Sequence, residues 1–180
     1  MPAIIQDLPL APTPMSIEVR GETLAVNPLQ ALVWVSVTSI GAASLDPRTP
    51  RIPAILDLGF NGSFAIRAEQ LRQWAGVDAR LFRKLRSAVL RGAPADERNA
   101  DLWLHPNAPG GADASGREPF RIRLDRSFFV LHPPVPEPDH RPRLPLIGVR
   151  AIVAAGLNLT LDGNRRRLSI RTASRFWFFG

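Results

Sequence analysis

One short stretch constrains this chain more than any other, IPAILDLGFNGSFAI over Ile52–Ile66. An apolar run of β-forming residues ends in a single carboxylate, Asp57, and the glycine-rich segment Leu58–Gly62 follows before apolar residues resume. Burying a carboxylate costs several kcal/mol unless the group is paired, hydrogen-bonded or protonated. The pattern therefore predicts two strands joined by a tight loop, with an acid that is either a turn residue or a functional group.

The rest of the chain is also predominantly β-forming. Ala31–Ile40 is rich in β-branched residues and predicts a strand that forms a hairpin with Arg51–Gly59. Leu157–Arg171 predicts a second hairpin with its turn at Asp162–Asn164. Further strands are expected at Ser63–Ile66, Ser87–Arg91, Asp101–His105, Pro119–Leu131 and the start of Leu144–Gly156, with a polar hairpin tip over Gly92–Asn99 joining the second and third of these.

Two short helices are expected between these strands. Ala68–Gly76 carries apolar residues at helical spacing and stops at a glycine. Val77–Leu90 has helix formers first and β-formers last, so we expect the helical region to continue and to give way to a strand near Ser87. The second helix is expected in the later part of Leu144–Gly156 and ends at its final glycine.

Length and composition predict a single globular domain. The chain has 180 residues, which is the usual size of one domain, and we expect that domain over residues 29–175. Residues 1–28 are predicted to form an N-terminal arm, within which Ser16–Val26 is a short hairpin, and residues 176–180, FWFFG, form an apolar tail. Proline runs indicate extended loops or linkers.

Charge and cysteine content limit the classes of function. The chain carries 23 basic and 16 acidic residues, but its arginines are scattered and only Arg165–Arg167 forms a run. Nucleic-acid binding needs a wider basic face, so we expect no nucleic-acid partner and keep that function as the weakest alternative. Cysteine is absent, which excludes disulfides and thiolate chemistry. No segment reaches membrane-spanning length, so a cytoplasmic protein without a membrane partner is expected.

Common cofactor and hydrolase motifs are missing from the sequence. The histidines His105, His132 and His140 lie beside prolines or in loops and lack metal-ligand spacing, so neither a metal nor another cofactor is expected. Neither a P-loop nor a dinucleotide-binding fingerprint occurs. Ser63 lacks the sequence context of a serine hydrolase nucleophile.

Three elements carry a resemblance to a known family. Ile55–Asp57, Gly59–Gly62 and, much later, Leu146–Gly148 match the bacterial retropepsin-like aspartic proteases in residue type and order. The resemblance covers roughly Ala31–Arg171. It implies a single retropepsin-like acid-protease barrel, mostly β, with one or two short helices.

The resemblance also implies a mechanism. In such enzymes two carboxyl groups about 3 Å apart share one proton and activate water. This chain repeats the motif nowhere, so the resemblance makes Asp57 the catalytic residue and implies a homodimer that brings two copies together. It further implies a flap around Gly92–Arg98 that closes over a peptide or protein substrate bound as an added strand. The implied substrate-binding residues are Gly59, Phe60, Asn61, Gly92 and Ala93.

One residue departs from the family pattern. Leu58 stands where the family has Thr or Ser, whose hydroxyl hydrogen-bonds across the dimer and holds the two carboxylates coplanar. Two hypotheses therefore stand side by side. The first is an aspartic endopeptidase that hydrolyses peptide bonds through a dyad formed across a homodimer. The second is a catalytically impaired domain that serves as a dimerisation or peptide-binding module, and in either case we expect the FWFFG tail at the dimer interface.

Overall fold

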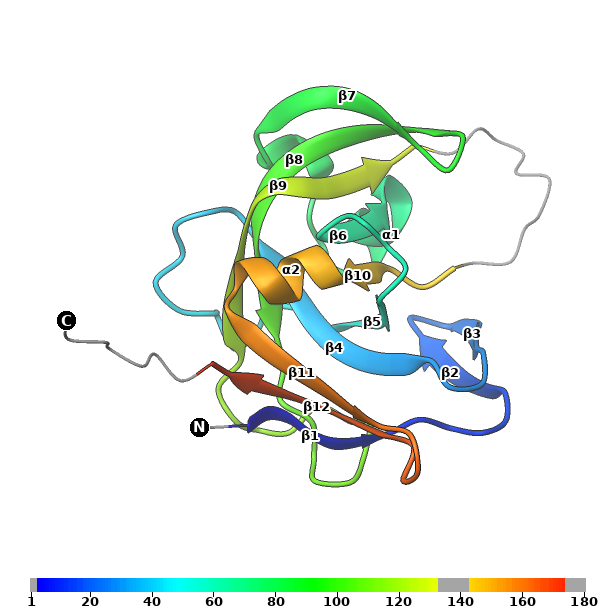
Figure 1. Ribbon diagram of the computed structural model, residues 1–180. Helices are drawn as coiled ribbons and strands as arrows, with labels where there is room; N and C mark the ends of the chain where they lie inside the picture. Colours follow the sequence, from blue (N-terminus) through cyan, green and yellow to red (C-terminus); the bar gives the residue numbers. More distant parts are fainter. Residues whose placement is uncertain (1–2, 133–142, 174–180) are drawn as a thin grey trace.

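The centre of the molecule is a closed barrel. The structure, a computed structural model, describes residues 3–132 and 143–173. Six strands form the barrel (Figure 1): β4 (Ala31–Thr38), β5 (Ile52–Asp57), β10 (Leu146–Gly148), β6 (Phe64–Arg67), β9 (Phe120–Leu131) and β8 (Ala93–Leu104). They neighbour one another in that order, and antiparallel pairing of β4 with β8 closes the ring. The prediction of a mostly β barrel with short helices is confirmed.

Continuous apolar runs account for the barrel walls. Nearly every residue of β4 and β5 is buried, which is the pattern of strands covered on both faces. The two strands form the predicted antiparallel hairpin, with Ala31 opposite Leu56. Inside, the ring of Phe128 packs against those of Phe64 and Phe82, with centroids 5.7 and 5.5 Å apart. These aromatic contacts join the barrel to the segment that precedes β7 (Lys84–Leu90).

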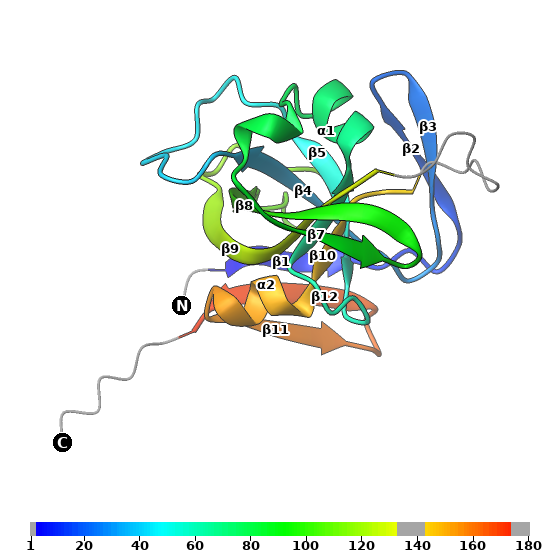
Figure 2. The same cartoon turned by 90° about the horizontal axis from the view of Figure 1, so that it is seen from above.

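A smaller sheet lies along one side of the barrel. It consists of β1 (Ala3–Pro9), β12 (Arg167–Thr172) and β11 (Leu157–Asp162), with β12 in the centre. β11 and β12 form the second predicted hairpin. Figure 2 shows the helix α2 (Val149–Ala154) lying along this sheet, and α2 also contacts the barrel strand β9.

The N-terminal segment is part of the packed structure. The predicted arm contains β1 and a hairpin of β2 (Met15–Val19) and β3 (Glu22–Val26), as expected for Ser16–Val26. Ile5 and Leu8 of β1 are fully buried in the core that the barrel shares. The tail at 176–180 lies outside the described residues.

The expected continuation of the helical region from Val77 to about Ser87 is wrong, whereas the strand expected from Ser87 is present as part of β7. The first helix is α1 (Ala68–Gln73), and after it the chain forms only one 3₁₀ turn, Ala79–Leu81, before β7 begins at Lys84. β7 pairs with β8 along its length. Cross-strand pairing therefore overrides the helix propensity of these residues. None of the helices in the described part of the chain is long and apolar enough to cross a membrane.

The expected hairpin tip over Gly92–Asn99 is also wrong, because the turn between β7 and β8 is much tighter. Arg91 and Gly92 form it, with φ angles of 51° and 82°, which suit a two-residue hairpin turn. The polar residues that follow belong to β8, and Glu97 and Arg98 are buried. Glu97 pairs with Arg86 across the hairpin, and Arg98 pairs with Asp96 of its own strand, so both charges are neutralised within the strand pair. The β7–β8 hairpin arches across one end of the barrel (Figure 1).

Candidate active site

Strand pairing brings the two separated sequence motifs together. β10 runs parallel to β5, with Gly148 opposite Asp57 and Ile147 opposite Leu56. On its other side β10 pairs with β6, where Ile147 lies opposite Phe64. The Asp57 carboxylate therefore stands at the end of a strand whose neighbour carries the second motif.

A tight loop orients the carboxylate. We call residues 57–63 the Asp57 loop. The Gly59 backbone N–H donates to Asp57 Oδ1 at 2.9 Å, and the Phe60 N–H donates to the Asp57 carbonyl at 3.1 Å. A Cβ at Gly59 would lie 3.3 Å from Asp57 Oδ1, which is a tight contact. The loop thus holds one carboxylate oxygen with a backbone donor that glycine brings close.

The Asp57 loop also passes directly over β10. A Cβ at Gly148 would lie 2.0 Å from the Gly62 carbonyl oxygen and 2.4 Å from that of Phe60. The Gly148 N–H donates to the Ser63 carbonyl at 3.0 Å. Only glycine fits at this crossing, because any side chain would collide with backbone atoms. The glycine of the second motif therefore has a structural role, because it leaves room for the Asp57 loop to pass over β10.

Asp57 is less buried than its apolar sequence context predicts. Its side chain is 31% exposed in the single chain, since it projects from the strand end rather than into the core. Its Oδ2 lies 3.6 Å from Nη2 of Arg91, an ion-pair distance that is too long for a hydrogen bond. The neighbouring Leu58 is 50% exposed. Thus an arginine at the hairpin turn faces the carboxylate, and an apolar side chain beside it is open to solvent.

A cavity of about 280 Å³ lies between the Asp57 loop and the turn of the β7–β8 hairpin. Of the predicted substrate-binding residues, Phe60 and Ala93 line it, and so does Arg91, which sequence reasoning missed. Gly59 instead contacts the carboxylate, and Gly92 forms the turn. Asn61 is exposed on the Asp57 loop and does not line the cavity. The remaining lining residues are Ala65, Ile66, Arg67, Gln70, Leu90, Leu131, Arg143, Leu144, Pro145 and Leu146.

A buried polar network lies behind the site. Glu97 of β8 accepts a hydrogen bond from the Ser127 N–H at 2.7 Å and pairs with Arg86 of β7. Ser127, with a φ of 61°, accepts at its carbonyl from the Ser63 N–H at 2.9 Å. Arg150 of α2 donates to Ser127 Oγ at 2.9 Å. One serine therefore links the hairpin, the end of the Asp57 loop and the helix.

The Glu97 carboxylate is held ionised by its partners. Burial raises its pKa, but the Ser127 N–H and the Arg86 guanidinium outweigh burial and hold the pKa of Glu97 below its ordinary value. Sequence reasoning placed Glu97 in the polar tip, and no local pattern distinguishes it from the exposed acids of the chain. Only the strand pairing of β8 with β9 brings its partner Ser127 close.

Asp96, next to Glu97, has a second set of partners. Its carboxylate contacts Lys84 Nζ at 2.6 Å and Arg98 Nη2 at 2.8 Å. Burial raises its pKa, but the two cations outweigh burial and lower the pKa of Asp96 from 3.8 to about 2. The base of the hairpin is therefore held together by charges that require ionised acids.

The three histidines were predicted to bind no metal. His105 is buried, and its Nε2 lies 2.9 Å from Ser36 Oγ. Burial lowers the pKa of His105 to about 4, which keeps the ring neutral. His132 lies 3.3 Å from Asp96, and His140 falls outside the described residues. His105 therefore contributes to packing as a neutral hydrogen-bonding group.

Comparison with known proteins yields no match to this chain, either among protein-family models or among curated proteins. The relevant features are a carboxylate held at a strand end by the Asp57 loop, a hairpin turn that faces it, and a cavity beside both.

Proposed function

We propose that this chain is a retropepsin-like aspartic endopeptidase that works as a homodimer, in which Asp57 supplies half of the catalytic dyad. One observation carries the proposal. Asp57 ends β5 directly opposite Gly148 of β10, and the Gly59 N–H of the Asp57 loop donates a hydrogen bond to its Oδ1. The β7–β8 hairpin is then the flap, with its turn above the carboxylate. The order of these elements matches the family resemblance.

The chemistry follows from the two oxygens of each carboxylate. Oδ1 of Asp57 accepts the Gly59 N–H, so Oδ2 is the oxygen available to water or to the twin carboxyl. In a dyad that shares one proton, the ionised member takes a proton from water while the protonated member polarises the scissile carbonyl. Because the proton belongs to the pair, neither carboxyl has a fixed role.

Exposed apolar side chains beside Asp57 support a second copy as the partner. Leu58 follows the carboxylate directly, and Val149 and Val153 lie on α2, which starts immediately after Gly148. All three are exposed in the single chain. Contact between copies would bury them and bring the two carboxylates together on a two-fold axis.

Leu58 also favours one alternative function. Without a hydroxyl at this position, the carboxylates lack the hydrogen bond that holds them coplanar in the family. A displacement of about 1 Å at a catalytic group can cost on the order of 100-fold in rate. The alternative is a dimerisation or peptide-binding module that retains the flap and cavity but has lost turnover.

The test is peptide hydrolysis by the purified protein. An unfolded protein substrate is incubated with it between about pH 3 and 7, and fragments are identified by mass spectrometry. We expect cleavage on the acidic side of that range, because one carboxyl of the dyad must be protonated. Cleavage that persists in Asp57→Asn would sink the proposal.

Two further measurements bear on the choice between the endopeptidase and the module. Sedimentation equilibrium tests the dimer, which the endopeptidase requires. Leu58→Thr restores the hydroxyl. Activity that appears only in this variant would favour the module, whereas ordinary turnover by the unmodified chain would favour the endopeptidase.

A further inference from the structure

The cavity beside Asp57 has a composition that points to a class of substrate. Three arginines, Arg67, Arg91 and Arg143, line it, and none of the described lining residues is acidic. They come from three separate parts of the chain: the end of β6, the flap turn and the segment before β10. The positive charges of Arg91 and Arg143 at one small cavity favour a negatively charged occupant.

A buried side chain builds this arrangement. Gln70 of α1 is 6% exposed, and its Nε2 donates to the Arg143 carbonyl at 2.7 Å. Its Oε1 accepts from the Arg67 N–H at 3.2 Å. One amide therefore ties the backbones of two of the arginines to the same point. The cavity is thus a supported site rather than a chance gap between surface residues.

Apart from the arginines and Gln70, the wall of the cavity is apolar. Ile66, Leu131 and Leu144 contribute aliphatic surface to it. Its volume, about 280 Å³, is at the lower end of small-molecule sites. An aliphatic stem that ends in a carboxylate matches both the wall and the arginines. Glutamate and aspartate side chains of a peptide have that chemistry.

We infer that the cavity is a substrate subsite that selects peptides with an acidic side chain close to the scissile bond. The inference rests on the proposed function and adds its substrate class. Arg91 connects the subsite to the chemistry, since it both lines the cavity and faces Asp57 Oδ2 at 3.6 Å. A substrate carboxylate in the cavity replaces Asp57 as the partner of Arg91, which removes that ion pair from Oδ2.

The first experiment measures binding without cleavage. The full-length Asp57→Asn variant is applied to an array of extended peptides in which each position is varied among Glu, Gln, Asp, Asn and Lys. We expect Glu or Asp at one position to raise binding on the order of tenfold over Gln or Asn, as hydrogen bonds to charged groups are strong. Equal binding of acid and amide at every position would overturn the inference.

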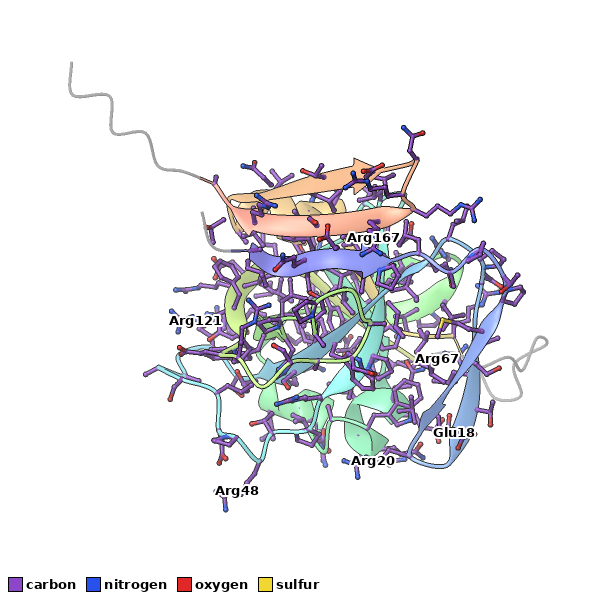
Figure 3. The ribbon with its side chains drawn as sticks, turned by 90° about the horizontal axis from the view of Figure 1, so that it is seen from below. Glu18, Arg20, Arg48, Arg67, Arg121 and Arg167 are labelled. Atoms are coloured by element: carbon purple, nitrogen blue, oxygen red, sulfur yellow. The ribbon has the colours of Figure 1, made fainter. Side chains whose placement is uncertain are left out.

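The second experiment reverses the charge of the subsite. Arg143→Glu should abolish the preference for acids at that position and favour Lys there. Arg48→Glu is the matched control, because Arg48 lies on the loop between β4 and β5, far from Arg67 of the cavity (Figure 3). The control should keep the acid preference. An unchanged preference in Arg143→Glu, with circular dichroism showing a folded chain, would also overturn the inference.

The peptide array tests the subsite and the cleavage assay tests the endopeptidase, so either proposal can be contradicted without the other. If acidic peptides bind but the unmodified chain cleaves none of them, the subsite stands and the endopeptidase fails, which leaves the peptide-binding module. If the chain cleaves peptides in an Asp57-dependent way without regard to acids, the endopeptidase stands and the subsite is wrong.

Discussion

Two carboxylates in this molecule, those of Asp57 and Glu97, differ in their exposure and in how fully they are hydrogen-bonded. Asp57 has a side chain that is 31% exposed, with one backbone hydrogen bond and an arginine 3.6 Å away. Glu97 has a side chain that is only 5% exposed, with the Ser127 N–H at 2.7 Å and an ion pair to Arg86. Sequence context predicts the reverse, since Asp57 follows an apolar strand and Glu97 lies in a polar segment.

The comparison separates a structural acid from a candidate catalytic one. Glu97 has its hydrogen-bonding capacity taken up by fixed partners, as buried polar groups usually do. Among the described residues, Asp57 Oδ2 pairs with a charged group only at Arg91, 3.6 Å away, so water, a second carboxyl or a substrate group can reach it. Functional sites are the places where such incomplete satisfaction is tolerated.

Asp57→Asn should cause the largest change in activity and almost none in stability. The amide still accepts the Gly59 N–H but cannot share a proton, so we expect cleavage to fall on the order of 1,000-fold or more. The melting temperature should change by about 2 °C or less. The two readouts are peptide hydrolysis and differential scanning calorimetry. A strongly destabilised variant would mean that Asp57 has the structural role assigned here to Glu97.

Gly148→Ala should unfold or strongly destabilise the chain, because its Cβ would lie 2.0 Å from the Gly62 carbonyl oxygen. We expect a loss of about 3 kcal/mol in the free energy of unfolding, measured with urea. Gly59→Ala is the matched control, since its Cβ meets only Asp57 Oδ1 at 3.3 Å. The control should lose about 1 kcal/mol or less. Equal losses would show that the crossing of the loop over β10 is not tight.

Glu97→Ala, at the second of the two carboxylates, should lower the free energy of unfolding. It leaves the buried Ser127 N–H without its acceptor, which costs about 2 kcal/mol in the free energy of unfolding. Glu97→Gln keeps an acceptor oxygen and should cost about 1 kcal/mol. Urea denaturation of both variants gives the two values. If Glu97→Ala were as stable as the unmodified chain, the hydrogen bond from the Ser127 N–H would not contribute to stability.

Acid should weaken the base of the β7–β8 hairpin before it exposes the core. The pKa of Asp96 is lowered from 3.8 to about 2, so its contribution to stability is present above pH 3.8 and is lost as the pH falls toward 2. The loss amounts to about 2 kcal/mol. Urea titrations at about pH 5 and pH 2.5 should show it, and Asp96→Asn should flatten the dependence. A dependence that is identical in the variant would assign the effect to other acids.

Local sequence determined most of the strands. Alternation and β-branched residues predict β4 and β5 correctly because these residues favour extended backbone wherever they are placed. The turn after Asp162 and the stop of α2 shortly before Gly156 were also predictable, as glycine and aspartate adopt turn conformations by themselves. For the same local reason, the Asp57 loop was recognisable as a tight connection.

The wrong predictions concern segments whose conformation is set by strand pairing. The stretch Val77–Leu90 has helix formers but lies beside β8, and the polar run after Gly92 becomes a strand because opposite charges face one another across the hairpin. A propensity describes one residue and its near neighbours. It contains no information about which side chains a distant strand will bring into contact.

Sequence alone determined that this chain forms strands, that Asp57 ends one of them and that glycines follow it. Tertiary structure alone decided that Gly148 seats the loop, that Arg91 faces the carboxylate and that three arginines surround one cavity. The physical reason is the distance along the chain over which each effect acts. Backbone preference acts within a few residues, whereas the partner of a charge is chosen by whatever folding places within a few ångströms of it.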